Sequence, residues 1–224
     1  MVACRTGALI SSPERLLPGH SKVVASVRRT ATGSGQFIDD FLPDWDFREE
    51  HSRRIVASPS QVRAALLAIT PRDLPLSGVM MALRLAPATV IARRRPRGLD
   101  RPWIELLLEF GFVELANQKE EIVVGAVGKF WRLREEAVPL TDAEAFARFT
   151  EPGFAKGAMN FRIADEGTAT RLTTETRVQA TDDRARRSFR PYWTPVRAVG
   201  GLMRLEMLRA VARRVTRPSE GLPD

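Results

Sequence analysis

Two threonines near the end of the sequence place hydroxyl groups where apolar side chains are expected. Residues 169–181 alternate as a half-buried strand requires, and Thr174 and Thr176 share one face with Leu172 and Val178. A hydroxyl on such a face lowers stability unless it finds a hydrogen-bond partner, and a ligand or a bound water could supply one. We therefore take these two threonines as candidates for ligand contact.

Arg204 lies within the apolar arc of a predicted helix. Met207, Leu208 and Val211 follow it at helical spacings, so its side chain has the phase of the buried face. We hypothesise that its guanidinium reaches a cavity and holds a carboxylate or phenolate of a ligand. The alternative is that its stem covers apolar surface while the charged head reaches water.

The elements that carry these residues are one strand and a long helical region that follows it. Two aspartates at 182–183 supply negative charge at the predicted helix start, and apolar residues recur at three- and four-residue spacings over 203–215. Pro191 and Pro195, together with the glycine pair at 200–201, remove hydrogen bonds and favour kinks. We therefore expect two or three helical pieces instead of one continuous helix.

The preceding part of the sequence predicts a mixture of helices and antiparallel strands. Ser58 and Pro59 are typical of a helix start, as N-cap and first helical residue. The hairpin signal is strongest where a polar interruption at 117–120 separates two strand-like runs. The predicted elements are strands at 48–56, 103–116, 121–131 and 154–164, helices at 58–69 and 76–85, an exposed loop at 93–98, and a short helix or irregular segment at 142–149.

In this order the elements resemble the helix-grip fold of the START-like superfamily, also called SRPBCC, which includes polyketide cyclases, aromatases and Bet v 1-like proteins. The stretch IVASPSQVRAALL (55–67) is similar to the family's junction of first strand and helix, and GTATRLTTETRV (167–178) to its last strand. Arg63 stands where many members have an aromatic residue, and their last helix is usually uninterrupted. The resemblance implies an α+β domain with a curved antiparallel sheet wrapped around a long, kinked C-terminal helix.

The resemblance also implies a small hydrophobic or amphipathic ligand, bound in a cavity between the sheet and the last helix. Physical reasoning agrees, because a strongly curved sheet under one helix can leave space that side chains do not fill. For the apolar residues of this face the alternative is plain core packing. The candidate ligand-binding residues are Phe110, Phe112, Val124, Met159, Phe161, Thr174, Thr176, Arg204 and Met207.

Catalysis has little support in the sequence, and we assign no catalytic residue. His51 and Ser52 are adjacent on a predicted strand and therefore point to opposite faces, which separates a nucleophile from its base. Glu105 and Glu109 would lie about 13 Å apart on one strand face, too far for a paired-carboxylate site unless a third element contributes. A polyketide cyclase or aromatase-like enzyme is the alternative function, with His51 and Glu109 as the acid or base to test.

Composition limits the class of protein and its partners. One cysteine, Cys4, and two histidines are too few for a disulfide framework or a zinc site, so we expect a reducing cytoplasm and neither cofactor nor metal. The formal net charge of +8 would attract nucleic acid or an anionic membrane surface, which makes a basic surface binder the second alternative. The arginines are scattered along the whole chain, so nucleic acid is not favoured as a partner. The residues that a basic surface would use are Arg93, Arg94, Arg95, Arg97, Arg213 and Arg214.

The 224 residues are expected to form one domain with tails, because 44% of them are hydrophobic, as in ordinary globular proteins. Residues 1–36 show no sustained period and are predicted to be a poorly ordered extension. The START-like domain would occupy 37–216, and 217–224 would be a tail. No run is long and apolar enough for a membrane span. The sequence indicates neither the identity of the ligand nor the oligomeric state.

Overall fold

The computed structural model describes residues 35–78, 100–132 and 136–216. The chain divides into two units, Met1–Ser34 and Gly35–Asp224, and every described residue belongs to the second unit. The predicted extension up to residue 34, the loop at 93–98, the later part of the helix at 76–85 and the tail at 217–224 lie outside the described residues.

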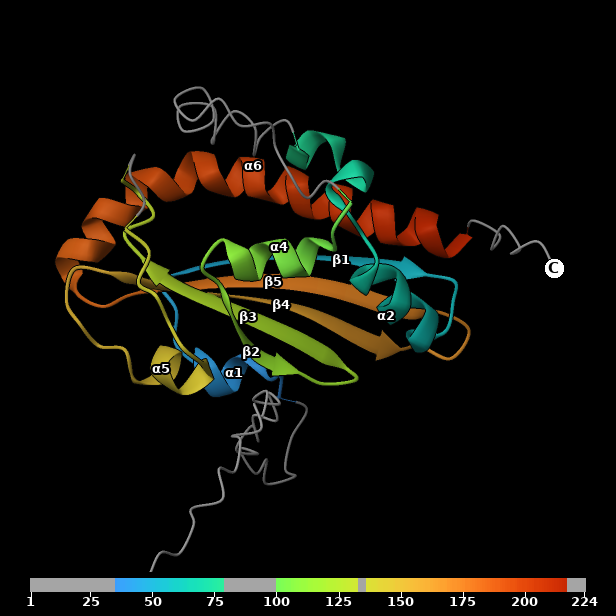
Figure 1. Cartoon of the computed structure of the whole chain (residues 1–224), viewed down its shortest axis with the longest axis horizontal. Helices are drawn as coiled ribbons and strands as arrows, with labels where there is room; N and C mark the ends of the chain where they lie inside the picture. The colour runs from blue at the N-terminus through green and yellow to red at the C-terminus, as the bar shows by residue number, and fades with distance from the viewer. Residues whose placement is uncertain (1–34, 79–99, 133–135, 217–224) are drawn as a thin grey trace, which may run out of the picture. The chain divides into compact units, whose positions relative to one another are not determined.

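Five antiparallel strands form one sheet with the order β1-β5-β4-β3-β2 (Figure 1). The strands are β1 (Phe47–Ile55), β2 (Val113–Asn117), β3 (Glu121–Gly128), β4 (Ala155–Asp165) and β5 (Thr170–Ala180). The predicted strands at 48–56, 121–131, 154–164 and 169–181 are therefore confirmed, with small changes at their ends. The turn at 118–120 joins β2 to β3, as the polar interruption predicts.

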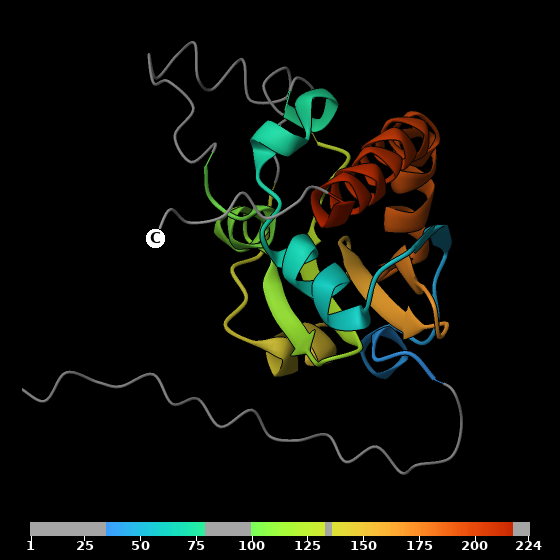
Figure 2. The same cartoon turned by 90° about the vertical axis from the view of Figure 1, so that its right-hand side faces the viewer.

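Helices lie on both faces of the sheet (Figure 2). The helices are α1 (Ile38–Phe41), α2 (Pro59–Leu67), the 3-10 turn η1 (Pro71–Asp73), α4 (Trp103–Glu109), α5 (Ala143–Arg148) and α6 (Asp183–Thr216). We call the face toward α2, α4 and α6 the inner face, and the face toward α1 and α5 the outer face. The described chain is thus an α+β arrangement with the long C-terminal helix on the inner face of the sheet.

The start of α2 follows from its sequence. Ser58 has an extended backbone, its hydroxyl accepts from the backbone N–H of Gln61, and the Gln61 side chain accepts from the backbone N–H of Ser58. With Pro59 at the first helical position, this capping box satisfies amide groups that the first turn would otherwise leave open. The predicted helix start is confirmed.

The segment before β2 corrects the predicted strand at 103–116. Residues Trp103–Glu109 form α4, and the strand begins only at Val113. The buried residues of α4 follow a helical and not an alternating pattern, and leucine and glutamate are good helix formers. Gly111, with φ of 90°, then turns the chain out of the helix. A continuous apolar run could not distinguish a buried helix from a strand.

The C-terminal helix corrects the expectation of two or three pieces. Helix α6 is continuous over 34 residues with Pro191 and Pro195 inside it, and Figure 1 shows its ribbon bending in the N-terminal part. Both prolines are exposed, so water can reach the carbonyl groups that lose an amide partner. Phe189 packs its ring against Phe47 and Trp193, at centroid distances of 5.0 and 5.9 Å, which holds this part of the helix on the sheet.

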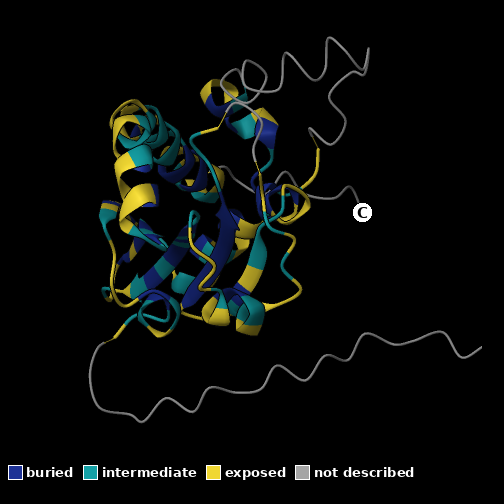
Figure 3. Ribbon diagram, turned by 90° about the vertical axis from the view of Figure 1, so that its left-hand side faces the viewer, coloured by how far each residue is buried: buried dark blue, intermediate teal, exposed yellow. Residues whose placement is uncertain are grey.

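Each face of the sheet has its own hydrophobic core. The inner core joins residues of α2, α4, β3, β4 and β5 to Met207, Leu208 and Val211 of α6. The outer core joins Ile38 and Leu42 to residues of β2, β3 and α5. Figure 3 shows the buried residues concentrated in the sheet and on the side of α6 that faces it. Among the described helices none is both long enough and apolar enough to span a membrane.

Candidate functional site

Two neighbouring rows of side chains cross the inner face from β3 to β1, as the strand register requires. The first row is Val124, Met159, Thr176 and Glu49. The second row is Ile122, Phe161, Thr174 and His51. Both rows are apolar on β3 and β4 and become polar on β5 and β1. The inner face therefore changes from apolar to polar along a direction perpendicular to its strands.

Arg204 of α6 lies over the polar end of the first row. Its Nη1 donates to Glu49 Oε2 at 2.9 Å, and its Nη2 donates to Thr176 Oγ1 at 2.7 Å. Glu49 Oε1 lies 2.8 Å from His51 Nε2. We call Arg204, Glu49, Thr176 and His51, together with the neighbouring Thr174, the inner cluster. It joins the C-terminal helix to the two strands of the sheet that lie below it.

Two buried polar atoms of the inner cluster lack a partner within the described chain. Thr174 has no exposed surface, and its hydroxyl finds no hydrogen-bond partner among the described residues. The Nε of Arg204 is likewise buried without a partner there. A third such atom, Trp103 Nε1, belongs to a side chain of the inner core. Buried polar groups are normally paired, so each of these atoms needs an explanation.

The charge of Arg204 is costly where it lies. Burial lowers the pKa of its guanidinium, and the Coulombic attraction of Glu49 acts in the opposite direction. The carboxylate of Glu49 is buried as well and serves both Arg204 and His51. Two opposite charges removed from water in this way are held by each other and by the hydrogen bonds around them.

The glycine pair at 200–201 leaves space beside the helix backbone for the side chains of the inner cluster. A methyl group at Gly201 would lie 2.6 Å from Glu49 Oε1 and 3.2 Å from His51 Nε2. A methyl group at Gly200 would lie 2.9 Å from Arg204 Nη1. The glycines that suggested a break in the helix instead let its backbone approach the carboxylate and accommodate the guanidinium.

The structure brings together eight of the nine residues predicted to bind a ligand. Val124, Phe161 and Met207 are buried in the inner core, with Phe112 and Met159 half-buried against it. Thr174, Thr176 and Arg204 are members of the inner cluster. Phe110 is the exception, because it is the C-cap residue of α4 and 47% of its surface is exposed. The sequence pattern placed Phe110 on a strand face, and this position is wrong because the predicted strand at 103–116 begins only at Val113.

Glu49 is a member of the site that the sequence did not reveal. It stands between Arg48 and Glu50 in a charged run, and only the pairing of β1 with β5 shows that it faces inward opposite Thr176. His51 lies two residues further along the strand and therefore points to the same face as Glu49. The sequence could have indicated Glu49 only through this shared phase. Glu109, the other acid or base to test, is exposed on α4 and paired with Arg101.

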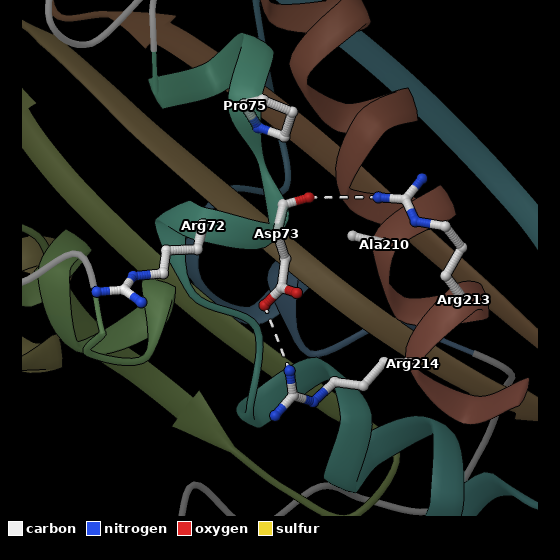
Figure 4. A pocket seen from close by; sticks show the side chains of 6 residues that line it. All are labelled: Arg72, Asp73, Pro75, Ala210, Arg213 and Arg214. Atoms are coloured by element: carbon white, nitrogen blue, oxygen red, sulfur yellow. Dashed lines mark hydrogen bonds and ion pairs between the residues drawn. The ribbon is translucent and has the colours of Figure 1, made fainter. Parts of the chain in front are cut away.

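A surface pocket of about 400 Å³ lies between η1 and the last turns of α6 (Figure 4). Arg72, Asp73, Arg213 and Arg214 line it, together with Pro75 and Ala210. Arg214 Nη1 donates to Asp73 Oδ2 and Arg213 Nη2 to the Asp73 backbone oxygen, each at 3.3 Å. None of the nine predicted ligand-binding residues lines this pocket. Within the described ranges, no group of three His, Cys, Asp or Glu side chains could hold a metal ion.

Comparison with known proteins assigns the chain to no family. No family model matches it, and no curated protein matches it. The similar solved structures include the crystal structure of TTHA0849 from Thermus thermophilus. The sequence identity is 12% and the TM-score 0.27, with 75% of this chain and 96% of that chain covered. A likeness at this level carries no argument about function.

Proposed function

We propose that the protein binds a small amphipathic ligand on the inner face of the sheet, beneath α6. The observation that carries the proposal is the buried hydroxyl of Thr174, which lacks a partner in the described chain and lies where the second row changes from apolar to polar. An unpaired buried hydroxyl lowers stability, and a ligand atom that pairs with it recovers that loss.

The two rows suggest how such a ligand lies. Its apolar body would contact Met159 and Phe161 on β4, and its polar end would reach Thr174 on β5 and Arg204 on α6. Met159 and Thr176 are paired across β4 and β5, and both are only half-buried, unlike their neighbours Val124 and Phe161. This less covered part of the inner face is therefore where we place the ligand.

The same proposal includes the finer fold assignment. A five-stranded antiparallel sheet with a long C-terminal helix on one face is compatible with the helix-grip fold, and we propose that the chain is a START-like protein. The capped junction of β1 and α2 and the last strand β5, which carried the resemblance, both support it.

Recovery of a bound compound tests the proposal. The protein would be purified without denaturation, and solvent extracts and native mass spectra of wild type, Arg204→Met and Arg197→Met would be compared. Arg197 is exposed on the same helix and makes no ion pair with any described residue, so it is the matched control. We expect a hydrophobic compound with wild type and Arg197→Met, and at least about a tenfold loss with Arg204→Met, which corresponds to about 1.4 kcal/mol. Equal recovery from all three proteins, or none from any, would contradict the proposal.

A cyclase-like enzyme is the alternative that one observation favours. If His51 Nε2–H donates to Glu49, the ring is oriented and its Nδ1 lone pair becomes available as a base. Such a base could take the α-proton of a ketone, and the enolate would add to a second carbonyl. The protonated base would return its proton to the alkoxide, and the β-hydroxy ketone would then lose its hydroxyl and a second α-proton as water, without a cofactor. Incubation of wild type and His51→Gln with a linear poly-β-ketone tests this, because only wild type should release the cyclised product.

A basic surface remains the second alternative, supported by Arg213 and Arg214 at the pocket beside η1. The arginines at 93–97 lie outside the described residues. Binding to an anionic vesicle or to nucleic acid should then weaken steeply with salt, and an Arg213→Gln/Arg214→Gln variant should bind less. Salt-independent binding would rule this alternative out.

A further inference from the structure

The inner cluster already balances its own charge, and this property limits the kind of ligand that it accepts. The positive charge of Arg204 is paired with Glu49 at 2.9 Å, and the same carboxylate also accepts from His51. A guanidinium with no carboxylate partner would attract an acidic ligand. Here the acidic group is supplied by the protein itself, so the cluster holds one positive and one negative charge when His51 is neutral.

The atoms that still lack partners favour hydrogen-bond acceptors on the ligand. Arg204 Nε can only donate, and the hydroxyl of Thr174 can donate or accept. Neither atom has a partner in the described part of the chain. A ligand that satisfies them must therefore bring oxygen or nitrogen lone pairs, and it need not bring a donor.

We propose that the ligand carries a neutral acceptor at its polar end, such as a ketone, aldehyde or ester carbonyl, and that carboxylic acids are discriminated against. This inference rests on the proposed function and sharpens it. A carboxylate would bring a second negative charge next to Glu49 in a site from which water is largely excluded, where like charges repel strongly. A carbonyl oxygen would accept from Arg204 Nε or Thr174 without changing the net charge of the cluster.

Two matched pairs of probes test the proposal: methyl dodecanoate against dodecanoate, and methyl 2-naphthoate against 2-naphthoate. Each pair has the same apolar body and differs at the polar end, where the ester carries a methyl group and the acid a negative charge. The binding of each probe would be measured by equilibrium dialysis against the full chain. We expect at least about tenfold tighter binding of the ester in whichever pair fits the apolar part of the site. Equal or tighter binding of the carboxylate would overturn the inference and leave ligand binding itself established.

Glu49→Gln separates a charge effect from a fit of shape. It keeps the size of the side chain and an acceptor oxygen but removes the negative charge that balances Arg204, so the preference should reverse in favour of the carboxylate. The double variant Glu49→Gln/Arg204→Gln has neither charge and should again prefer the ester. If Glu49→Gln does not fold, the wild-type ratio and the double variant decide the question.

The compound recovered from the native protein provides an independent outcome. A recovered ketone, aldehyde or ester supports the inference, whereas a recovered carboxylic acid overturns it while confirming ligand binding. Failure to bind all four probes, together with no recovered compound, would remove the proposed function and this inference with it.

Discussion

Strand β5 carries buried polar groups on both faces, and their hydrogen-bond partners come from different parts of the chain. On the outer face Glu175 accepts from Arg48 and Arg177, and Arg177 also donates to Asp39 and to the backbone oxygen of Leu42. Asp39 and Leu42 belong to the segment that contains α1, so Arg177 binds that segment to the sheet. We call these outer-face residues the outer network.

A second group on the outer face has the same purpose. Glu121 accepts from the backbone N–H groups of Phe37 and Ile38 and from the side chain of Asn160, which also donates to Gln36. Backbone groups of the segment 36–42 thus complete the polar groups of the sheet. The hydrogen bonds of the inner cluster described above join side chains only. Buried atoms without a partner among the described residues occur on both faces: Thr174 Oγ1 and Arg204 Nε in the inner cluster, and Glu175 Oε2 and Arg162 Nε on the outer face. The two faces therefore differ in the source of their partners: the segment 36–42 supplies those of the outer network, whereas α6 and β1 supply those of the inner cluster, where we propose that a ligand binds.

Removing Arg177 should give the largest loss of stability. Arg177→Met breaks the bonds to Glu175, Asp39 and Leu42 and leaves the buried Glu175 with Arg48 alone. Loss of one partner of a buried pair costs about 3–5 kcal/mol, and the free energy of unfolding in urea would measure it. Ligand affinity should not change in the fraction that remains folded, because Arg177 is on the outer face.

Arg171→Met is the matched control for that experiment. Arg171 is on the same strand with the same phase as Arg177, but it is exposed and paired with Glu166 near the end of the strand. Exposed ion pairs contribute about 0–1 kcal/mol, so this variant should remain close to wild type. Equal effects of the two substitutions would remove the distinction between a buried network and an ordinary surface pair.

Gly201→Ala should act on the inner cluster through the helix backbone. Alanine favours a helix over glycine by about 1 kcal/mol, but the added methyl group would lie 2.6 Å from Glu49 Oε1. Overpacking of this kind costs about 1–3 kcal/mol, so we expect a net loss of stability together with weaker ligand binding. Gly157→Ala, also on the inner face, would make only ordinary contacts at 3.7 Å or more and is the control. A stabilised Gly201→Ala protein with unchanged binding would contradict the close approach.

Thr174→Val should separate stability from binding. Its hydroxyl has no partner in the described chain, so a group of the same shape should leave the free energy of unfolding unchanged or raise it by up to about 1 kcal/mol. Affinity for the ligand should fall by about two- to tenfold, the usual value of one hydrogen bond. Thr176→Val is the partner experiment, because it removes the acceptor of Arg204 Nη2 and should lower stability by about 1 kcal/mol. If both variants changed stability equally, Thr176 would not be the hydrogen-bonded threonine and Thr174 the one without a partner.

The difference between the two faces could be predicted from the sequence only in part. The alternation of 169–181 indicated that Thr174 and Thr176 share a face, and helical phase placed Arg204 toward the interior; the structure brings these three residues together. Glu49 could not be placed, because its role depends on pairing between strands more than a hundred residues apart in the chain. Local pattern also could not show that α4 is a helix, since its run of apolar residues fits a buried helix and a buried strand equally.

Long-range packing also reversed what local propensity predicted for α6. Pro191 and Pro195 remain inside a continuous helix because the aromatic residues of its first turns pack on β1. The outer face shows the same principle, since the charged residues Glu175 and Arg177 of β5 are buried under the segment that contains α1. In both cases the segment that covers the strand decides the environment, and alternation cannot reveal it.

Acid should weaken the outer network. Burial alone would raise the pKa of the Glu175 carboxyl, but hydrogen bonds and charges of Arg48 and Arg177 outweigh it, so the pKa is lowered from its ordinary value of 4.5. The unfolded chain therefore takes up a proton at a higher pH than the folded one. The stabilisation that the two arginines give to the ionised Glu175 is complete above pH 4.5 and is lost as the pH falls through the folded pKa.

Glu175→Gln tests this assignment. In the variant the free energy of unfolding should fall less steeply with decreasing pH below pH 4.5, by at most about 1.4 kcal/mol per pH unit for one proton. Urea titrations of both proteins at a series of acidic pH values measure the two slopes, and parallel curves would show that Glu175 is not the group that the two arginines hold ionised.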